Sequence, residues 1–175
     1  MSISQMLLGE FDEEMKNTRR LLECVPDGKF DYKPHPRSMT LGQLATHVAQ
    51  MSNWAATTLD VELLEFGPDF RPPLAHTRAE LLDMFDSGVA QARQKISAAS
   101  DADWQKTWTL KFNGNVILSM PRTVIMRSTV MNHMIHHRAQ LGVYLRLNEI
   151  AIPGMYGPSA DEAHLWAQKG EAKGA

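Results

Sequence analysis

The chain has 175 residues and a formal net charge of −2; 43% of its residues are hydrophobic and 22% are charged. This composition is typical of a soluble globular protein, and the length suits one domain, residues 1–175. There is no basic tract and no apolar run near the ~20 residues that cross a bilayer, so we expect neither a nucleic-acid nor a membrane partner. Cys24 is the single cysteine and the N-terminus lacks signal-peptide features, which favours a cytoplasmic location without disulfides.

The first part of the chain predicts two long helices joined by an extended, proline-containing link. Apolar residues recur at alternating spacings of three and four from about residue 4 to residue 25, which is the pattern of a bundle helix. Thr40 followed by Gln43 forms a capping box and marks the start of the second helix. We expect this second helix to continue to about Glu65.

The middle of the chain predicts a third helix and then a small hairpin. The proline-rich segment 67–73 cannot be helical throughout, and the next apolar-periodic run extends from residue 77 to about residue 100. Asn113-Gly114 separates two β-prone runs, Trp108–Phe112 and Val116–Leu118. An Asn-Gly pair in this setting is a hairpin signal. We therefore place a small hairpin between the third and fourth helices.

The fourth helix is expected from about residue 123 to residue 147, and a short terminal helix from about residue 160 to residue 168. The apolar stripes of the four long helices together predict one hydrophobic core. Its expected members are Leu8, Phe11, Met15, Leu22, Leu44, Val48, Ala55, Phe85, Val89, Ile96, Val130 and Leu141. Four long helices with one small hairpin indicate an all-α fold.

Three histidines fall on the core-facing sides of two of these helices. His133 and His137 are four residues apart in the fourth helix, so they lie on one face, and His47 lies at the edge of the core stripe of the second helix. Burying unpaired imidazoles is costly, and an i, i+4 pair can bind one ion. Three imidazoles from two helices would leave a fourth position open, which is typical of a reactive metal site.

A resemblance to a known family rests on two segments in addition to His47. They are His133-Met134-Ile135-His136-His137-Arg138-Ala139-Gln140-Leu141 and Tyr156-Gly157-Pro158-Ser159-Ala160-Asp161-Glu162. With these segments the chain resembles the DinB-like (DinB/YfiT) family of metal-binding four-helix-bundle proteins over nearly its whole length. The resemblance implies an up-down-down-up helix order, and it implies that His47, His133 and His137 are the metal ligands.

The predicted site is compatible with several metals and several reaction classes. Zinc, nickel and iron all suit imidazole ligands. Met134 follows His133, so the chain lacks the His-Glu-x-x-His motif, in which a general base follows the first ligand. The resemblance implies a thiol-dependent transferase, using a low-molecular-weight thiol, ahead of a hydrolase that activates water. The alternative is a non-catalytic metal-binding, sensing or dimerisation module. Tyr144, Tyr156, Asp161 and Glu162 could assist only if the tail folds over the site.

Two further expectations concern the flanks of the fourth helix. His136 lies beside the core stripe, and we interpret it as a neighbour of the metal ligands or a partly exposed residue rather than a ligand. On the side opposite the metal-facing stripe, the helix carries a second apolar row, and Arg138 and Arg146 could lie at its rim. The members of this row are Val124, Met131, Ile135 and Gly142. A helix with two apolar faces is usually buried on both, so we expect a homodimer through this helix, unless the hairpin or tail covers the row.

Overall fold

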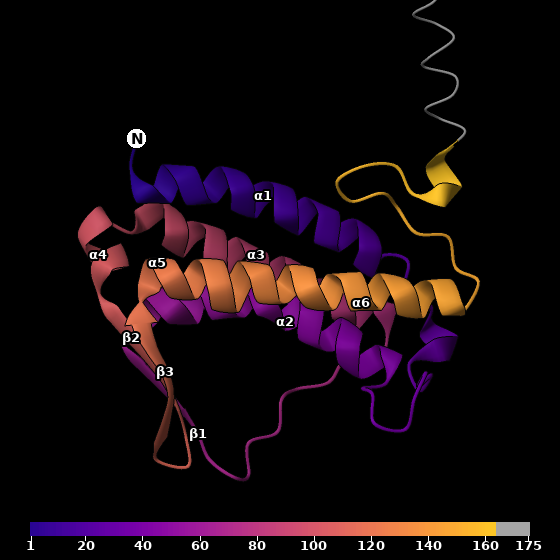
Figure 1. Cartoon of the computed structure of the whole chain (residues 1–175), viewed down its shortest axis with the longest axis horizontal. Coiled ribbons are helices and arrows are strands. Elements are labelled where there is room, and N and C mark those ends of the chain that lie inside the picture. The colour runs from indigo at the N-terminus through magenta and orange to yellow at the C-terminus, as the bar shows by residue number, and fades with distance from the viewer. Residues whose placement is uncertain (164–175) are drawn as a thin grey trace, which may run out of the picture.

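The computed structural model describes residues 1–163 of the chain. Four long helical segments pack lengthwise, and a small sheet lies at one end of them (Figure 1). The helices and helical turns are α1 (Ile3–Leu22), η1 (Asp27–Lys29), α2 (Leu41–Asp60), α3 (Arg78–Ala98), α4 (Asp101–Gln105), α5 (Arg122–Ile125), η2 (Met126–Asn132), α6 (His133–Leu147) and η3 (Ala160–Glu162). The strands are β1 (Leu63–Phe66), β2 (Thr107–Phe112) and β3 (Asn115–Pro121).

The long helices follow an up-down-down-up order. α1 and α6 run in one direction and α2 and α3 in the other (Figure 1). This order is possible because the chain from β1 to α3 returns along the length of the bundle, so that α3 starts at the same end as α2. α3 packs against both α1 and α2, and α6 packs against α2. The helix order implied by the family resemblance therefore agrees with the structure.

The expected all-α fold class needs correction, because the structure is mostly helical with a three-stranded sheet. The predicted hairpin exists as β2 and β3, and its turn places Asn113 and Gly114 at positive φ angles of 49° and 77°. The expected extension of the second helix to Glu65 is wrong. The helix ends at Asp60, and β1 pairs in parallel with β2, so that Leu63 lies opposite Thr109. Backbone pairing with a distant strand here prevails over local helical periodicity.

The sequence identifies the helix starts better than the helix ends. Thr40 and Gln43 form the expected capping box, since each side chain accepts a hydrogen bond from the other residue's backbone N–H. The first helix ends at Leu22, three residues before the expected position. In the tail, Ala160–Glu162 forms a 3-10 turn. The rest of the predicted terminal helix, up to Gln168, lies outside the described residues.

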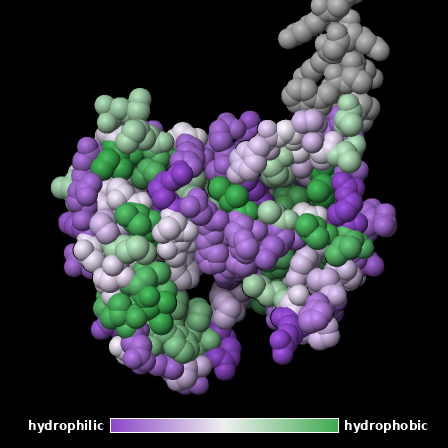
Figure 2. Space-filling model, in the orientation of Figure 1, coloured by the Kyte–Doolittle hydropathy of each residue, from purple (hydrophilic) through white to green (hydrophobic). Residues whose placement is uncertain are grey.

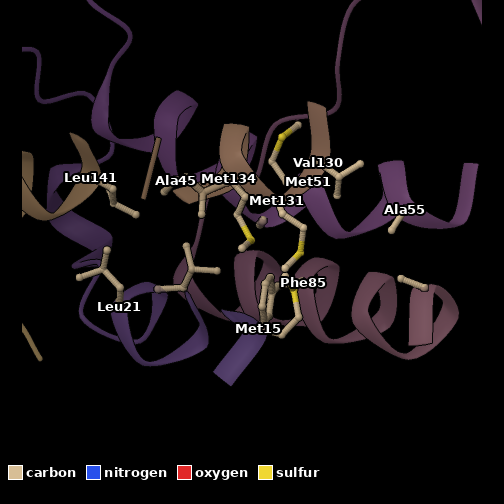
Figure 3. Packing of buried hydrophobic residues seen from close by; sticks show 14 of the residues in the cluster. Met15, Leu21, Ala45, Met51, Ala55, Phe85, Val130, Met131, Met134 and Leu141 are labelled. Atoms are coloured by element: carbon tan, nitrogen blue, oxygen red, sulfur yellow. The ribbon is translucent and has the colours of Figure 1, made fainter. Parts of the chain in front are cut away.

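The core lies between the four long helices, where α1, α2, α3, the π-helical segment η2 and α6 all contribute side chains (Figure 3). Ten of the twelve predicted core residues are buried, and Leu8 and Val89 are half-buried against the same cluster. Trp104 and Trp108 are both fully buried at the sheet end of the bundle. The Trp104 indole N–H donates to Ser4 Oγ at 2.8 Å, which joins α4 to the start of α1. Among the described residues, no helix is long and apolar enough to span a membrane.

Candidate metal centre

Two neighbouring elements carry the three predicted histidines into one cluster. His47 lies near the middle of α2, His133 is the first residue of α6, and His137 follows one helical turn later. α2 and α6 pack directly against each other, so residues distant in sequence meet. The potential ligand atoms of the three side chains lie within 4.8 Å of one another, and all three residues are half-buried.

The separations between the imidazole nitrogens fit one small cation. His47 Nε2 lies 3.4 Å from His133 Nε2, and His133 Nε2 lies 2.9 Å from His137 Nε2. A tetrahedral ion with bonds of ~2.0–2.1 Å holds its nitrogen ligands about 3.3 Å apart. An ion would therefore require the closer pair to spread by a few tenths of an ångström, and the third pair, His47 and His137, has its ligand atoms within 4.8 Å. The donor set, three imidazoles without thiolate or carboxylate among the described residues, suits zinc, nickel or iron.

A side chain on α6 orients one of these imidazoles. His137 Nδ1 lies 2.7 Å from Gln140 Oε1, and since Gln140 Oε1 can only accept, Nδ1 carries the hydrogen. The Nε2 lone pair of His137 therefore faces the cluster. Metal-binding histidines commonly use the second ring nitrogen in this way. The spacing of three residues between His137 and Gln140 is the sequence signal that could have identified this partner.

Burial keeps His47 and His133 uncharged, which is the state in which an imidazole can bind a cation. Desolvation, followed by the charges of His137 and His133, lowers the pKa of His47 to about 4. Desolvation, followed by the charge of His137, also lowers the pKa of His133. At neutral pH these two rings are uncharged, so their Nε2 lone pairs are available to a metal.

A π-helical turn, Met126–Asn132, immediately precedes His133. A π turn contains more residues per turn than an α-helix, so it rotates the helix face that follows it. In the helix that follows, Met134 and Arg138 are buried, while His133 and His137 are half-buried beside His47. The sequence predicted one regular helix from residue 123 and therefore missed this segment. π turns are frequent at functional sites.

The other candidates around the site are held elsewhere. His136 is exposed, and its ring packs edge-on against His137 with 4.9 Å between ring centroids, which agrees with a neighbouring rather than a ligating role. Tyr156 Oη contacts the Glu14 carboxylate at 2.9 Å and accepts from Arg138 at 2.6 Å. Tyr144 donates to the Met39 carbonyl. The hydroxyl groups of these two tyrosines are therefore engaged by Glu14, Arg138 and the Met39 carbonyl.

The two acidic tail residues instead tether the tail to the bundle. Asp161 forms an ion pair with Arg146, and Glu162 forms one with Arg20 at 3.1 Å. Neither carboxylate belongs to the histidine cluster. The tail is therefore fixed to α1 and α6 by ion pairs, and the described tail residues supply no general base to the candidate centre.

A cavity of about 390 Å³ opens beside His47. One wall is the α2 face that carries Gln43, His47 and Gln50, and the facing wall is the chain between β1 and α3, including Arg71. A small molecule in this cavity would reach the edge of the histidine cluster. Sequence reasoning missed Arg71 because the loop that carries it has no periodicity linking it to α2.

Comparison with known proteins places the chain in a family, because the model of the DinB family matches residues 1–171. The chain belongs to the DinB family. Protein YrdA of Bacillus subtilis (strain 168), described as uncharacterized, is 24% identical over 163 residues, covering 93% of this chain and 92% of YrdA. This match extends over nearly the full length of both chains.

Two solved structures share the DinB-family fold. A DinB-like protein from Bacillus cereus ATCC 10987 has a TM-score of 0.68 and 20% identity, covering 89% of this chain and 98% of the other. The DinB-like protein YjoA from Bacillus subtilis has a TM-score of 0.65 and 15% identity, covering 86% of this chain and 96% of the other. At these identities the likeness concerns the fold alone.

Proposed function

We propose that this DinB-family protein is a metal-dependent enzyme whose metal ligands are His47, His133 and His137. The convergence of three imidazole Nε2 atoms carries this proposal. A divalent zinc, nickel or iron ion would act there as a Lewis acid and lower the pKa of a thiol or a water. Three protein ligands leave a position for such a molecule, unlike structural zinc sites closed by four ligands.

Transfer involving a low-molecular-weight thiol is the reaction class we favour. Hydrolysis by a metal site usually uses a protein base beside the activated water, and no carboxylate joins the histidine cluster among residues 1–163. Forming a thiolate requires less of the protein, since a coordinating thiol loses its proton to solvent without a dedicated base. The chain's own contribution is to hold His47 and His133 neutral through burial and to orient His137 through Gln140.

The decisive experiment measures metal content in protein purified without a histidine tag. Wild type should retain about one divalent ion per chain, and His133→Ala should lose most of it because two imidazoles remain. His136→Ala is the matched control, since this exposed neighbour should leave the content unchanged. Full metal content in His133→Ala would refute the site.

A second measurement separates an enzyme from a non-catalytic metal-binding module. The metal-loaded protein is screened with low-molecular-weight thiols and electrophilic acceptors, and product formation is compared with the His133→Ala variant. Chelation should remove activity while the helical circular dichroism persists, because four packed helices form the core independently of the site. Unfolding on chelation would instead indicate a structural metal.

A further inference from the structure

Arg71, an exposed residue in the lining of the cavity beside His47, brings a positive charge next to a site that holds uncharged rings. Arg71 Nη1 donates to the carbonyl oxygens of Pro68 at 3.0 Å and Phe70 at 2.9 Å, which fixes the guanidinium on its loop. Its Nε and Nη2 groups have no hydrogen-bond or ion-pair partner within residues 1–163, and no carboxylate lines the cavity there. The two unused groups form a fork that matches a carboxylate.

The loop that carries Arg71 is anchored to the helix that carries His47. Gln50 Nε2 donates to the Pro73 carbonyl at 2.7 Å, so the Arg71 loop and the α2 face keep a defined relation. Gln43 Oε1 accepts from the Thr40 N–H at 2.9 Å, and its Nε2 has no partner among the described residues. Gln43 therefore offers a second donor on the cavity wall, one helical turn before His47.

The rest of the cavity lining is mainly apolar. Met39, Pro72 and Leu74 contribute to it. A ligand that fills the cavity therefore contacts the His47 ring at the edge of the histidine cluster, apolar side chains and the Arg71 guanidinium.

We propose that this cavity binds a thiol with a short apolar chain and a carboxylate, and that Arg71 selects the carboxylate while the sulfur faces the histidines. This proposal rests on the metal-dependent function proposed above and names the substrate class of the same site. Arg71 is a specificity-determining residue in this arrangement, and its removal should leave metal binding intact.

The test uses the full chain loaded with Co²⁺, in which thiolate coordination produces a near-ultraviolet absorption band. 3-Mercaptopropionate and the neutral 3-mercapto-1-propanol are titrated into wild type, Arg71→Gln and Arg93→Gln. Arg93 is the matched control because it forms an ion pair with Asp12 on the α1–α3 surface. Wild type and Arg93→Gln should prefer the carboxylate by roughly threefold to tenfold, and Arg71→Gln should show no preference while retaining Co²⁺. Equal preference in Arg71→Gln and wild type would overturn the proposal.

A second readout keeps this inference separate from the metal chemistry. Saturation-transfer NMR with butyrate and 1-butanol reports carboxylate recognition without any thiol. Stronger transfer to butyrate in wild type than in Arg71→Gln supports the Arg71 assignment even if neither thiol produces an absorption band, in which case only the proposed thiol chemistry fails. No difference between wild type and Arg71→Gln in butyrate binding refutes the role of Arg71.

Discussion

At the scale of single residues, the candidate centre depends on a side chain that does not ligate. Gln140 holds His137 in the tautomer that presents Nε2 to the cluster. Loss of such outer partners typically lowers metal affinity about 10–100-fold. We therefore expect Gln140→Leu to weaken metal binding by about tenfold without unfolding the chain, as measured by competition with a chromophoric chelator. An unchanged affinity would show that the ring is oriented by packing alone.

The lowered pKa values of His47 and His133 make the stability of the metal-free protein depend on pH. His47 has a pKa of about 4 in the folded state and near its ordinary value of 6.5 when unfolded. The unfolded chain therefore binds more protons between these values, so the free energy of unfolding falls as the pH falls from about 6.5 toward 4. His133 acts in the same direction.

Urea titrations of the metal-free protein at about pH 7.5 and pH 5 measure this dependence. His47→Gln should show a smaller loss of stability at the lower pH than wild type, because it lacks the strongly shifted group. His76→Gln should follow wild type, since His76 is exposed and lies outside the cluster. A His47→Gln curve that loses as much stability as wild type would contradict this account.

Helical spacing and the family resemblance together identified the three histidines, but not their surroundings. Helical spacing placed His133 and His137 on one face, and the structure brings His47 to them. Gln140 was within reach of the same spacing argument. Helical spacing could not have identified Arg71, because its position beside His47 depends on a loop held by the Gln50–Pro73 hydrogen bond.

At the scale of elements, α3 offers a direct test of the core. Phe85 is only 1% exposed and belongs to the central cluster (Figure 3). Phe85→Ala should lower the free energy of unfolding by about 3–5 kcal/mol through lost burial and a residual cavity. Phe112→Ala in β2 is the control, since Phe112 is 45% exposed and its loss should cost far less. A change below about 1 kcal/mol for Phe85→Ala in denaturant titration would contradict the observed packing.

Local patterns predicted the elements whose causes are local. The Thr40–Gln43 cap and the Asn113-Gly114 turn both rest on contacts within a few residues. β1 escaped prediction because its partner β2 lies beyond α3 in the sequence. The π-helical turn was not predicted because Met126–Asn132 has an ordinary helical composition. Both features depend on where the chain packs, which periodicity does not encode.

At the scale of the whole molecule, the structure shows that the second apolar row expected on the fourth helix is partly buried within the chain itself. Met131 is fully buried within the chain, and Ile152 of the tail lies near Gly142. The expected rim position of Arg138 is wrong, because its side chain is 2% exposed and forms a 2.7 Å ion pair with Glu14. The tail thus covers part of the row.

Apolar residues nevertheless remain on the outer side of α6. Hydrophobic residues show at the surface over the later part of α6 and over the hairpin (Figure 2). Val143 is 58% exposed and Leu147 56%. Beside them, a cavity of about 450 Å³ lies between α6 and the tail, and Ile135 contributes to its wall. We propose that a second copy of the chain covers this surface in a homodimer.

Light scattering tests the dimer at micromolar concentration. Wild type should be a dimer, and Ile135→Glu should be a folded monomer. Val143→Glu is a second variant that avoids the core, because Val143 is exposed whereas Ile135 packs against the core. Lys111→Glu, on the sheet, should remain dimeric. A monomeric wild type refutes the proposal.

The pairing of β1 with β2 has a consequence for the order in which the chain folds. β2 and β3 are joined by a two-residue turn, so this hairpin can close on a microsecond timescale. β1 can join it only after the chain containing α3 has doubled back, and loop-closure entropy opposes such non-local contacts until helix packing compensates. Amide hydrogen exchange during refolding should therefore protect the hairpin amides before those bonded to β1. The chain between β1 and α3 also carries Arg71, so the cavity beside His47 would be completed late.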